Sequence, residues 1–368
     1  MASAISLRVL GPGGVGARRL AVNSILVQHR TSLCSAGSRV KGISTSSIDR
    51  SNDIALRRSY LYVPASSDRM LEKSLSTNSD VIIYDLEDSI PPSVSDKESA
   101  RERLAFFLSV QLNLPQRERV AVRVNDITTP FFEKDVSEML KFGAVGTLVL
   151  PKIHTARDLH HVSRAIHKSV TYSSRHSTVP PLRMVASIES ARGTWNLGDI
   201  ASWTSEYGAE AGGKLDALLF AAEDYCADTS VVRTSSRQEL LYVRSQIVIA
   251  AKAFGLNAID MVCVNYKDLN YLKDECEDGR RLGFNGKQAI HPTQVDIVQS
   301  TFVPTAKEIL RAAKIFHQME IAHSSQKGAF GLETDEGGKE MIDAPMLKQA
   351  ANTLRIARTA GLEIPRID

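Results

Sequence analysis

The segment LRMVASIES, residues 182–190, is an almost continuous apolar run that ends in a carboxylate, Glu189. The segment DALLFAAED, residues 216–224, has the same design and ends in Glu223 and Asp224. Continuously apolar runs of this length are typical of strands that are covered on both faces, as in parallel sheets. A carboxylate at the end of such a strand needs a partner, because an unpaired buried charge is costly. The two segments therefore predict buried strands whose ends carry chemistry.

Six more segments of this kind are spaced along the chain. They are SYLYVP (59–64), DVIIYDLED (80–88), ERVAVRVND (118–126), VGTLVLPKI (145–153), NAIDMVCVN (257–265) and the weaker GFNGKQAIHP (283–292). Helical patterns separate most of them, and the helix after the first segment would be capped by Ser66 or Ser67. Eight strands that alternate with helices predict an α/β fold, a (β/α)8 TIM barrel. An open, doubly wound sheet is the alternative.

The chain divides into three parts in this interpretation. We expect a leader over residues 1–50, a TIM-barrel catalytic domain over residues 57–320, and a C-terminal lid or arm over residues 321–368 with a helix from about 346 to 360. The tail is too long for a simple connector, so we expect it to cover the site or to reach a neighbouring subunit. A further stretch, residues 204–214, is expected to be a surface loop.

The leader has a composition of its own. It contains seven basic residues and one acid, and it is rich in Ser and Thr. This is typical of a mitochondrial transit peptide and predicts a location in the mitochondrial matrix, with an ordinary disordered tail as the alternative. The whole chain carries +3, so the rest carries about −3 (+3 minus +6). Such a body does not favour nucleic-acid binding, and no apolar stretch of about 18 residues predicts a membrane span.

Polar side chains gather at the carboxyl ends of the predicted strands. They are Tyr62, Asp85, Glu87, Asp88, Arg123, Asn125, Lys152, Glu189, Glu223, Asp224, Asn265 and His291. Barrel enzymes carry their catalytic groups at these ends, so we expect one shared mouth. Glu189 and Asp224 lie on adjacent strands, and two carboxylates without a nearby His or Cys suit a hard cation, Mg²⁺ above all. The alternative is that each carboxylate pairs with a neighbouring Arg or Lys.

Three groups of residues admit two interpretations each. The planar fork of Arg123 suits a clamp for a carboxylate or an enolate, but it also suits a partner for the acids of the second strand. Arg69 and Lys73 lie in the first helix, where a phosphate group or solvent would accommodate them. His291 precedes Pro292, so a capping or core role fits as well as a substrate contact.

Seven motifs together resemble the HpcH/HpaI aldolase family, in particular its citrate lyase β-subunit-like group. They are YLYVPASSDRMLEKS, DLEDSIPPSVSDKESAR, VRVN, SIESARG, FAAEDYCADT, GKQAIHP and MIDAP. The resemblance spans residues 57–360, and the paired SIESARG and AAEDYCAD motifs are specific to it. Within this group the chain is most similar to the mitochondrial branch, which the transit-like leader supports.

The resemblance implies a Mg²⁺-dependent lyase that acts on an acyl-CoA thioester. The metal ligands carry over to Glu189 and Asp224, and the group that grips the substrate carboxylate or enolate carries over to Arg123. Asp343 in MIDAP is implied as the acid/base residue, supplied by an adjacent subunit, which implies a homo-oligomer and favours a trimer. The implied CoA and substrate contacts are Tyr62, Arg69, Lys73, Ile290 and His291.

The reaction implied is cleavage of (3S)-citramalyl-CoA to acetyl-CoA and pyruvate by a carbon–carbon lyase. A malyl-CoA lyase or malate synthase-type activity would use glyoxylate instead; one methyl group separates the two, which a pocket discriminates by only about 1–3 kcal/mol. A citrate lyase β subunit, which needs an acyl-carrier partner, is another alternative. A barrel that binds acyl-CoA or a partner without catalysis is the alternative of a different class.

Overall fold

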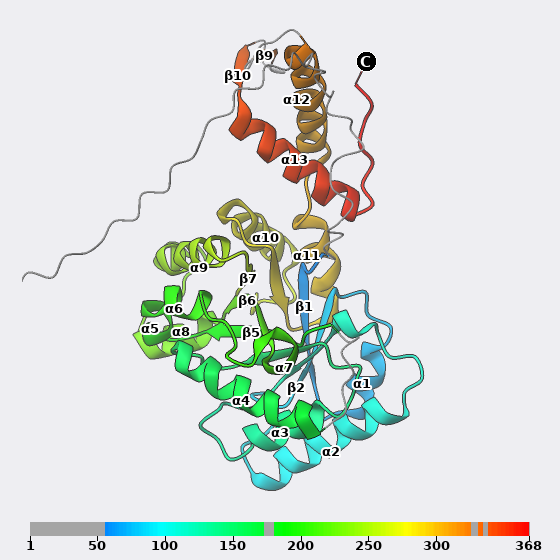
Figure 1. Ribbon diagram of the computed structural model, residues 1–368, viewed down its shortest axis with the longest axis vertical. Coiled ribbons are helices and arrows are strands. Elements are labelled where there is room, and N and C mark those ends of the chain that lie inside the picture. Colours follow the sequence, from blue (N-terminus) through cyan, green and yellow to red (C-terminus); the bar gives the residue numbers. More distant parts are fainter. Residues whose placement is uncertain (1–55, 173–179, 325–329, 334–337, 368) are drawn as a thin grey trace, which may run out of the picture. The chain divides into compact units, whose positions relative to one another are not determined.

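The computed structural model describes residues 56–172, 180–324, 330–333 and 338–367. Eight parallel strands close into a barrel in sequence order (Figure 1). The strands are β1 (Ser59–Pro64), β2 (Val81–Asp85), β3 (Val120–Arg123), β4 (Thr147–Leu150), β5 (Arg183–Ile188), β6 (Lys214–Phe220), β7 (Asn257–Asp260) and β8 (Gly286–Ala289). The predicted (β/α)8 barrel is confirmed, because β8 pairs with β1 and closes the eight-stranded sheet. The predicted leader lies outside the described residues.

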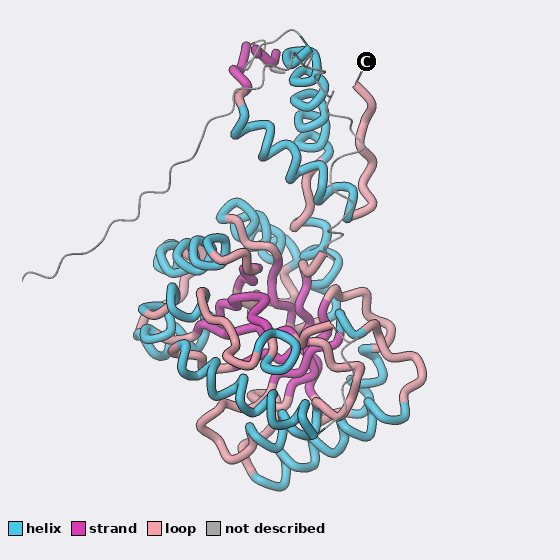
Figure 2. Tube along the Cα trace, viewed as in Figure 1, coloured by secondary structure: helices cyan, strands magenta, loops and turns pink. Residues whose placement is uncertain are grey.

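Helices surround the strands (Figure 2). They are α1 (Asp68–Ser74), α2 (Val94–Val110), η2 (Arg117–Arg119), α3 (Phe132–Met139), α4 (Ala156–Tyr172), α5 (Ala191–Trp195), α6 (Leu197–Ala201), α7 (Gly208–Gly212), α8 (Ala222–Thr229), η3 (Gln238–Leu240), α9 (Leu241–Ala253), α10 (Leu269–Leu282), η4 (Pro292–Gln294) and α11 (Val295–Thr301). The first helix is capped by Ser67, whose side chain accepts a hydrogen bond from the Met70 amide. Of the two capping residues predicted, the structure therefore selects Ser67. No described helix is both long and apolar enough to cross a membrane.

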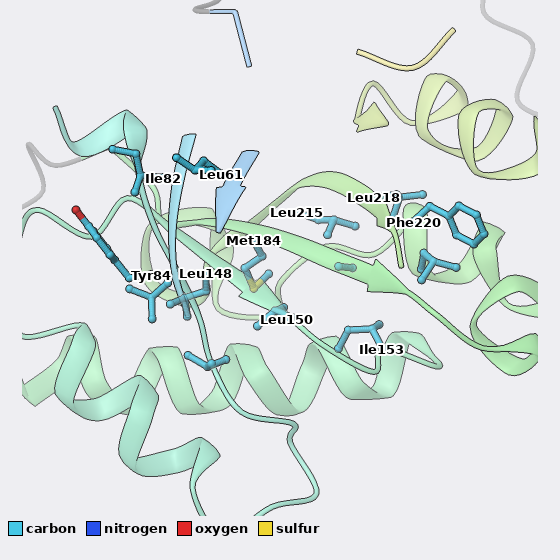
Figure 3. Close-up of a cluster of buried hydrophobic side chains, with 14 of the residues drawn as sticks. Leu61, Ile82, Tyr84, Leu148, Leu150, Ile153, Met184, Leu215, Leu218 and Phe220 are labelled. Atoms are coloured by element: carbon cyan, nitrogen blue, oxygen red, sulfur yellow. The ribbon is translucent and has the colours of Figure 1, made fainter. Parts of the chain in front are cut away.

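Two apolar layers explain why the strands are hydrophobic along their whole length. Successive side chains of a strand point to opposite faces. Leu61, Ile82 and Tyr84 face outward and pack beneath the helices (Figure 3). Their neighbours face inward and fill the barrel: Tyr60, Val81, Ile83, Ala121, Val149, Val185, Ala217, Leu219 and Ile259. Both faces of each strand are therefore covered, as the continuous apolar runs predict.

The same alternation places the polar residues. Counting two residues onward from the inward-facing Tyr60, Ile83 and Ala121 leads to Tyr62, Asp85 and Arg123. Counting four from Val185 leads to Glu189. These side chains therefore share the carboxyl end of the barrel interior, above the apolar layer.

Two details differ from the prediction. Strand β6 ends at Phe220, so Glu223 and Asp224 are not strand residues but lie in the first turn of α8. Residues 204–214 are not a plain surface loop, because they contain α7 and its Gly212 is buried. A Cβ atom at Gly212 would lie 1.9 Å from Ser205 Oγ, so the close approach requires glycine.

The C-terminal segment forms a small unit with its own apolar cluster. It contains α12 (Ala306–Ser324), the antiparallel strands β9 (Phe330–Glu333) and β10 (Lys339–Ile342), and α13 (Ala344–Thr359). Helices α12 and α13 lie side by side (Figure 1) and bury Ile309, Ile315 and Leu354 between them. The helix expected near 346–360 is thus α13, and α12 shares its core. The role of this arm as a lid or a contact to a neighbour stays a prediction.

Candidate active site

A groove of about 890 Å³ runs along β1, α1 and the segment that follows β8. It brings together the five residues that the family resemblance implied as CoA or substrate contacts: Tyr62, Arg69, Lys73, Ile290 and His291. They come from opposite ends of the chain and meet because β1 pairs with β8 at the point where the barrel closes. Two exposed cations, Arg69 and Lys73, line a wall that also contains apolar side chains.

Tyr62 connects this groove to the barrel interior. Its hydroxyl donates a hydrogen bond of 3.1 Å to Gln288 Oε1 on β8. Its ring lies 4.8 Å from the guanidinium carbon of Arg123, a cation–π contact. Burial raises the pKa of Tyr62, so the phenol stays protonated at neutral pH. Tyr62 therefore presents a fixed, neutral aromatic wall between the groove and the polar mouth.

His291 has the capping role that the sequence left open. Its Nδ1 accepts a hydrogen bond of 3.3 Å from the Thr293 amide, at the start of η4. The ring also stacks on Tyr266, with 5.2 Å between ring centroids. These contacts fix the imidazole at the edge of the groove, next to the 43% exposed Ile290. Capping and lining the groove are thus compatible.

Glu189 is the most deeply placed carboxylate of the implied metal pair. It is only 7% exposed, and its Oε1 accepts a hydrogen bond of 2.7 Å from the Lys152 amide. Burial raises the pKa of Glu189 to about 8, and the charges of Asp224 and Glu87 add to this effect. Among the ion pairs of the described residues, Glu189 has none with Arg or Lys. The alternative of a simple ion pair does not describe its surroundings.

Asp224 approaches Glu189 from the first turn of α8. It lies closer to solvent than Glu189, and burial raises its pKa, with the charge of Asp88 adding to the rise. Its neighbour Glu223 pairs instead with Arg233, which also binds Glu275 at 2.8 Å. The two acids of this turn therefore have different partners, and Asp224 is the one whose charge acts on Glu189.

Arg123 is paired with the acids of β2, as the second interpretation of its sequence context held. Its Nε and Nη2 bind the two carboxylate oxygens of Asp85, each at 2.7 Å. Its Nη1 lies 3.0 Å from both Glu87 Oε2 and Asp88 Oδ2. Burial opposes ionisation of Asp85, but Arg123 more than compensates and lowers the pKa of that carboxyl. A role as a substrate clamp stays a prediction and would use Nη1, beside the exposed Asp88.

The donor set at this mouth fits a divalent cation. Glu189 and Asp224 offer hard oxygen ligands, and both pKa values are raised first by burial and then by the charges of nearby carboxylates. A doubly charged ion would remove that repulsion, and Mg²⁺ takes one or two carboxylates together with waters and substrate oxygens. In the described part of the chain no group of three or more His, Cys, Asp or Glu residues could hold a metal ion, so such an ion would rely on this pair.

Asp343 lies on the arm. It is the exposed N-cap of α13, and its Oδ1 accepts a hydrogen bond of 3.3 Å from the Met346 amide. This contact positions the carboxylate at a helix start and leaves its other oxygen available. Its assignment as the acid/base residue stays a prediction.

Comparison with known proteins decides the family. The model of the HpcH/HpaI aldolase/citrate lyase family matches residues 58–292, which include the whole barrel. The chain belongs to this family. The resemblance inferred from the seven motifs is therefore confirmed, and with it the expectation of a carbon–carbon lyase.

Relatives within the HpcH/HpaI family include enzymes of two kinds. Mitochondrial citramalyl-CoA lyase from Homo sapiens is 32% identical over 302 residues, which cover 82% of this chain and 85% of that protein. Citrate lyase subunit beta from Leuconostoc mesenteroides subsp. cremoris is 32% identical over 311 residues, 84% of this chain and 96% of that protein. A structure of CitE from Mycobacterium tuberculosis with magnesium, acetoacetate and coenzyme A matches with a TM-score of 0.62 at 27% identity and covers 84% of this chain and 100% of that one.

Two residues of this family member gained importance only in the structure. Glu87 is 5% exposed and contacts Arg123 and Lys152, and burial raises its pKa to about 7. Lys152 donates its backbone N–H to Glu189 and its ammonium to Glu87. Their positions at the ends of predicted strands could be found from the sequence. Their contacts could not be predicted, because these depend on the register between neighbouring strands.

Proposed function

We propose that this protein is a Mg²⁺-dependent lyase that cleaves (3S)-citramalyl-CoA to acetyl-CoA and pyruvate. One observation carries the proposal: two mutually repelling carboxylates, Glu189 and Asp224, lie at the mouth of a barrel whose edge carries a groove with two exposed cations. The similarity to human citramalyl-CoA lyase supports this substrate, and the CitE complex with magnesium and coenzyme A supports both the metal and the thioester.

Glu189 and Asp224 would hold the metal ion. When bound, Mg²⁺ would act as a Lewis acid that stabilises negative charge on the substrate oxygens. Glu189 is oriented for this role by the Lys152 amide, since the hydrogen bond to Oε1 leaves Oε2 available. Asp224 would complete the pair from the first turn of α8.

The remaining groups would manage charge and protons during cleavage. The tertiary hydroxyl of the substrate loses its proton, the carbon–carbon bond breaks, pyruvate leaves, and the electron pair stays on acetyl-CoA as an enolate. Arg123, held rigidly by Asp85, would offset the charge of that enolate through Nη1. Asp343 would accept the proton that the hydroxyl loses and then deliver it to the enolate carbon, which completes acetyl-CoA.

The groove would hold the coenzyme. Arg69 and Lys73 are exposed on α1 and suit the phosphates of CoA, which are anionic at neutral pH. Tyr62, Ile290 and His291 line the part of the groove that leads toward the mouth and would contact the thioester arm. This arrangement would bring the reactive carbonyl next to Arg123, because the Tyr62 ring touches its guanidinium.

We further propose a homo-oligomer, with a trimer favoured, in which Asp343 reaches the mouth of a neighbouring barrel. Its exposed position on the arm supports such a contact. We also propose a location in the mitochondrial matrix, supported by the leader composition and by the mitochondrial citramalyl-CoA lyases among the relatives.

A citryl thioester lyase is the second candidate. The citrate lyase β subunit of Leuconostoc is as similar to this chain, at 32% identity, as the human citramalyl-CoA lyase. That candidate would release oxaloacetate in place of pyruvate. In the β-subunit form it would require an acyl-carrier partner.

An assay of the purified protein with citramalyl-CoA, malyl-CoA and citryl-CoA tests the proposal. We expect citramalyl-CoA to be cleaved faster than the other two thioesters, with release of pyruvate. This turnover should stop with EDTA and resume with added Mg²⁺. The Asp224→Ala variant should fold and lose this turnover. Turnover that survives both EDTA and Asp224→Ala, or a faster release of glyoxylate or oxaloacetate, would contradict the proposal.

A further inference from the structure

Lys152 follows β4 with a backbone conformation that is unusual for its residue type. Its φ is 52°, in the left-handed region that residues other than glycine rarely adopt. Two hydrogen bonds hold the following turn: His154 Nδ1 lies 2.7 Å from Ser190 Oγ, and Asn196 Nδ2 donates to the His154 carbonyl at 2.9 Å. The turn is therefore anchored to the segment after β5, and the strain at Lys152 is held in place by its surroundings.

This conformation lets one residue contact two acids at once. The Lys152 amide donates to Glu189 Oε1 at 2.7 Å, and the Lys152 ammonium lies 3.1 Å from Glu87 Oε1. Both carboxylates are buried, whereas the Lys152 side chain is 40% exposed. Asp88 and Asp224 lie near enough for their charges to interact with that ammonium.

The cations that face these acids differ in their freedom to move. Arg123 is bound by two parallel hydrogen bonds to Asp85. Lys152 has a flexible four-carbon stem, and among the described residues its ammonium forms one ion pair, with Glu87. An entering divalent ion would therefore meet Arg123 as a fixed part of the site and Lys152 as a charge that can withdraw toward solvent.

We propose that Lys152 is a positioning residue that sets the metal affinity of the site. Its backbone holds Glu189, and its ammonium stands among the carboxylates as an internal cation with which the divalent ion competes. This inference rests on the proposed metal site at Glu189 and Asp224. The Lys152 ammonium lowers the affinity of the site for Mg²⁺ below the affinity that the same carboxylates would have without it.

The test is calorimetric titration of MgCl₂ into metal-free protein, for the wild type and four variants at one position. Lys152→Met, Lys152→Ala and Lys152→Gly remove the ammonium and keep the amide, and we expect each to bind Mg²⁺ about tenfold more tightly. Lys152→Arg keeps the charge and should bind like the wild type. A residue with a merely structural role would weaken binding on removal, so the sign of the change is decisive.

Thermal unfolding separates the backbone from the charge. Lys152→Gly should melt about 2–4 °C above Lys152→Ala, because glycine adopts a φ of 52° without strain. The two should nevertheless share the same Mg²⁺ affinity. Lys141→Met is the matched control, since it removes a lysine that pairs with Glu138 at 2.7 Å on α3, and it should leave Mg²⁺ affinity unchanged.

The outcomes distinguish the two proposals. If the wild type binds no Mg²⁺, the proposed function fails together with this inference. If the wild type binds Mg²⁺ and cleaves its thioester, but the three ammonium-free variants bind Mg²⁺ equally or more weakly, only the role of Lys152 is overturned. Tighter binding in Lys141→Met would overturn it as well, because a general charge effect would then explain the result.

Discussion

At the scale of single residues, Glu189 makes the stability of the metal-free protein depend on pH. Folding raises the pKa of this carboxyl from 4.5 to about 8, so the folded state binds its proton more tightly than the unfolded state. Each pH unit between these values therefore lowers stability by about 1.4 kcal/mol, and above about pH 8 the loss is complete. We expect the metal-free wild type to lose stability from pH 5 to pH 8.

Glu189→Gln should remove most of this slope, because the amide has nearly the same shape and no charge. Urea unfolding at several pH values, in the presence of EDTA, measures the effect. Gln should stabilise the metal-free protein at pH 8 and have little effect at pH 5. Parallel stability curves for the two proteins would mean that Glu189 is not the group that titrates.

Metal binding should release protons for the same reason. At pH 7 Glu189, with a pKa of about 8, is largely protonated, and Glu87, with a pKa of about 7, is partly so. Mg²⁺ binds the ionised form, so its affinity should rise with pH up to about 8. Calorimetry in two buffers of different ionisation enthalpy should detect the release of about one proton per ion at pH 7. Binding heats that do not depend on the buffer would contradict this.

Sequence reasoning reached the identity of these residues but not their partners. The polar residues that end the apolar runs, Arg123, Glu189 and Asp224, mark the mouth. The alternation of side chains along a strand can be counted in the sequence and predicts which of them point inward. The pairing of Asp85 with Arg123 depends on the register of β2 against β3, which forms between segments distant in sequence. The left-handed turn at Lys152 likewise has no signal in its residue type.

At the scale of elements, α8 depends on a buried ion-pair network. Arg233 follows this helix and binds Glu223 in its first turn, and it also donates to Glu275 on α10 at 2.8 Å. Glu275 is fully buried and has a second partner in Lys287, at 3.1 Å. The network links the turn that carries Asp224 to α10 and β8. The boundary of α8 was missed from the sequence because the apolar run of β6 continues through Ala221 and Ala222 into the start of the helix.

Arg233→Gln should therefore weaken both the fold and the metal site. Loss of one of two partners of the buried Glu275 should cost about 2–4 kcal/mol of unfolding free energy, measured by urea denaturation. Mg²⁺ binding should weaken, because the first turn of α8 loses its anchor. Arg280→Gln is the matched control, since its pair with Glu308 is largely exposed and should contribute at most about 1 kcal/mol. An equal effect of both variants would contradict the network's role.

At the scale of the whole molecule, the barrel and the arm hold different parts of the proposed machinery. The barrel carries Glu189 and Asp224, and the arm carries Asp343 on a unit with its own apolar cluster. The alternation of strands and helices predicted the closed barrel. The small fold of the arm was less predictable, since its cluster joins α12 to α13 across a polar stretch without periodicity.

If Asp343 acts on a neighbouring subunit, two inactive variants should restore activity when they are mixed. Asp224→Asn removes a proposed metal ligand, and Asp343→Asn removes the acid while Asn still caps α13. After unfolding and joint refolding in equal amounts, about a quarter of the sites of a cyclic oligomer would combine an intact barrel with an intact neighbouring arm. A mixture of Asp224→Asn with Glu189→Gln is the control and should stay inactive, because every barrel in that mixture lacks one of the two proposed metal ligands. No recovery in the first mixture would place Asp343 in its own subunit's site or outside the reaction.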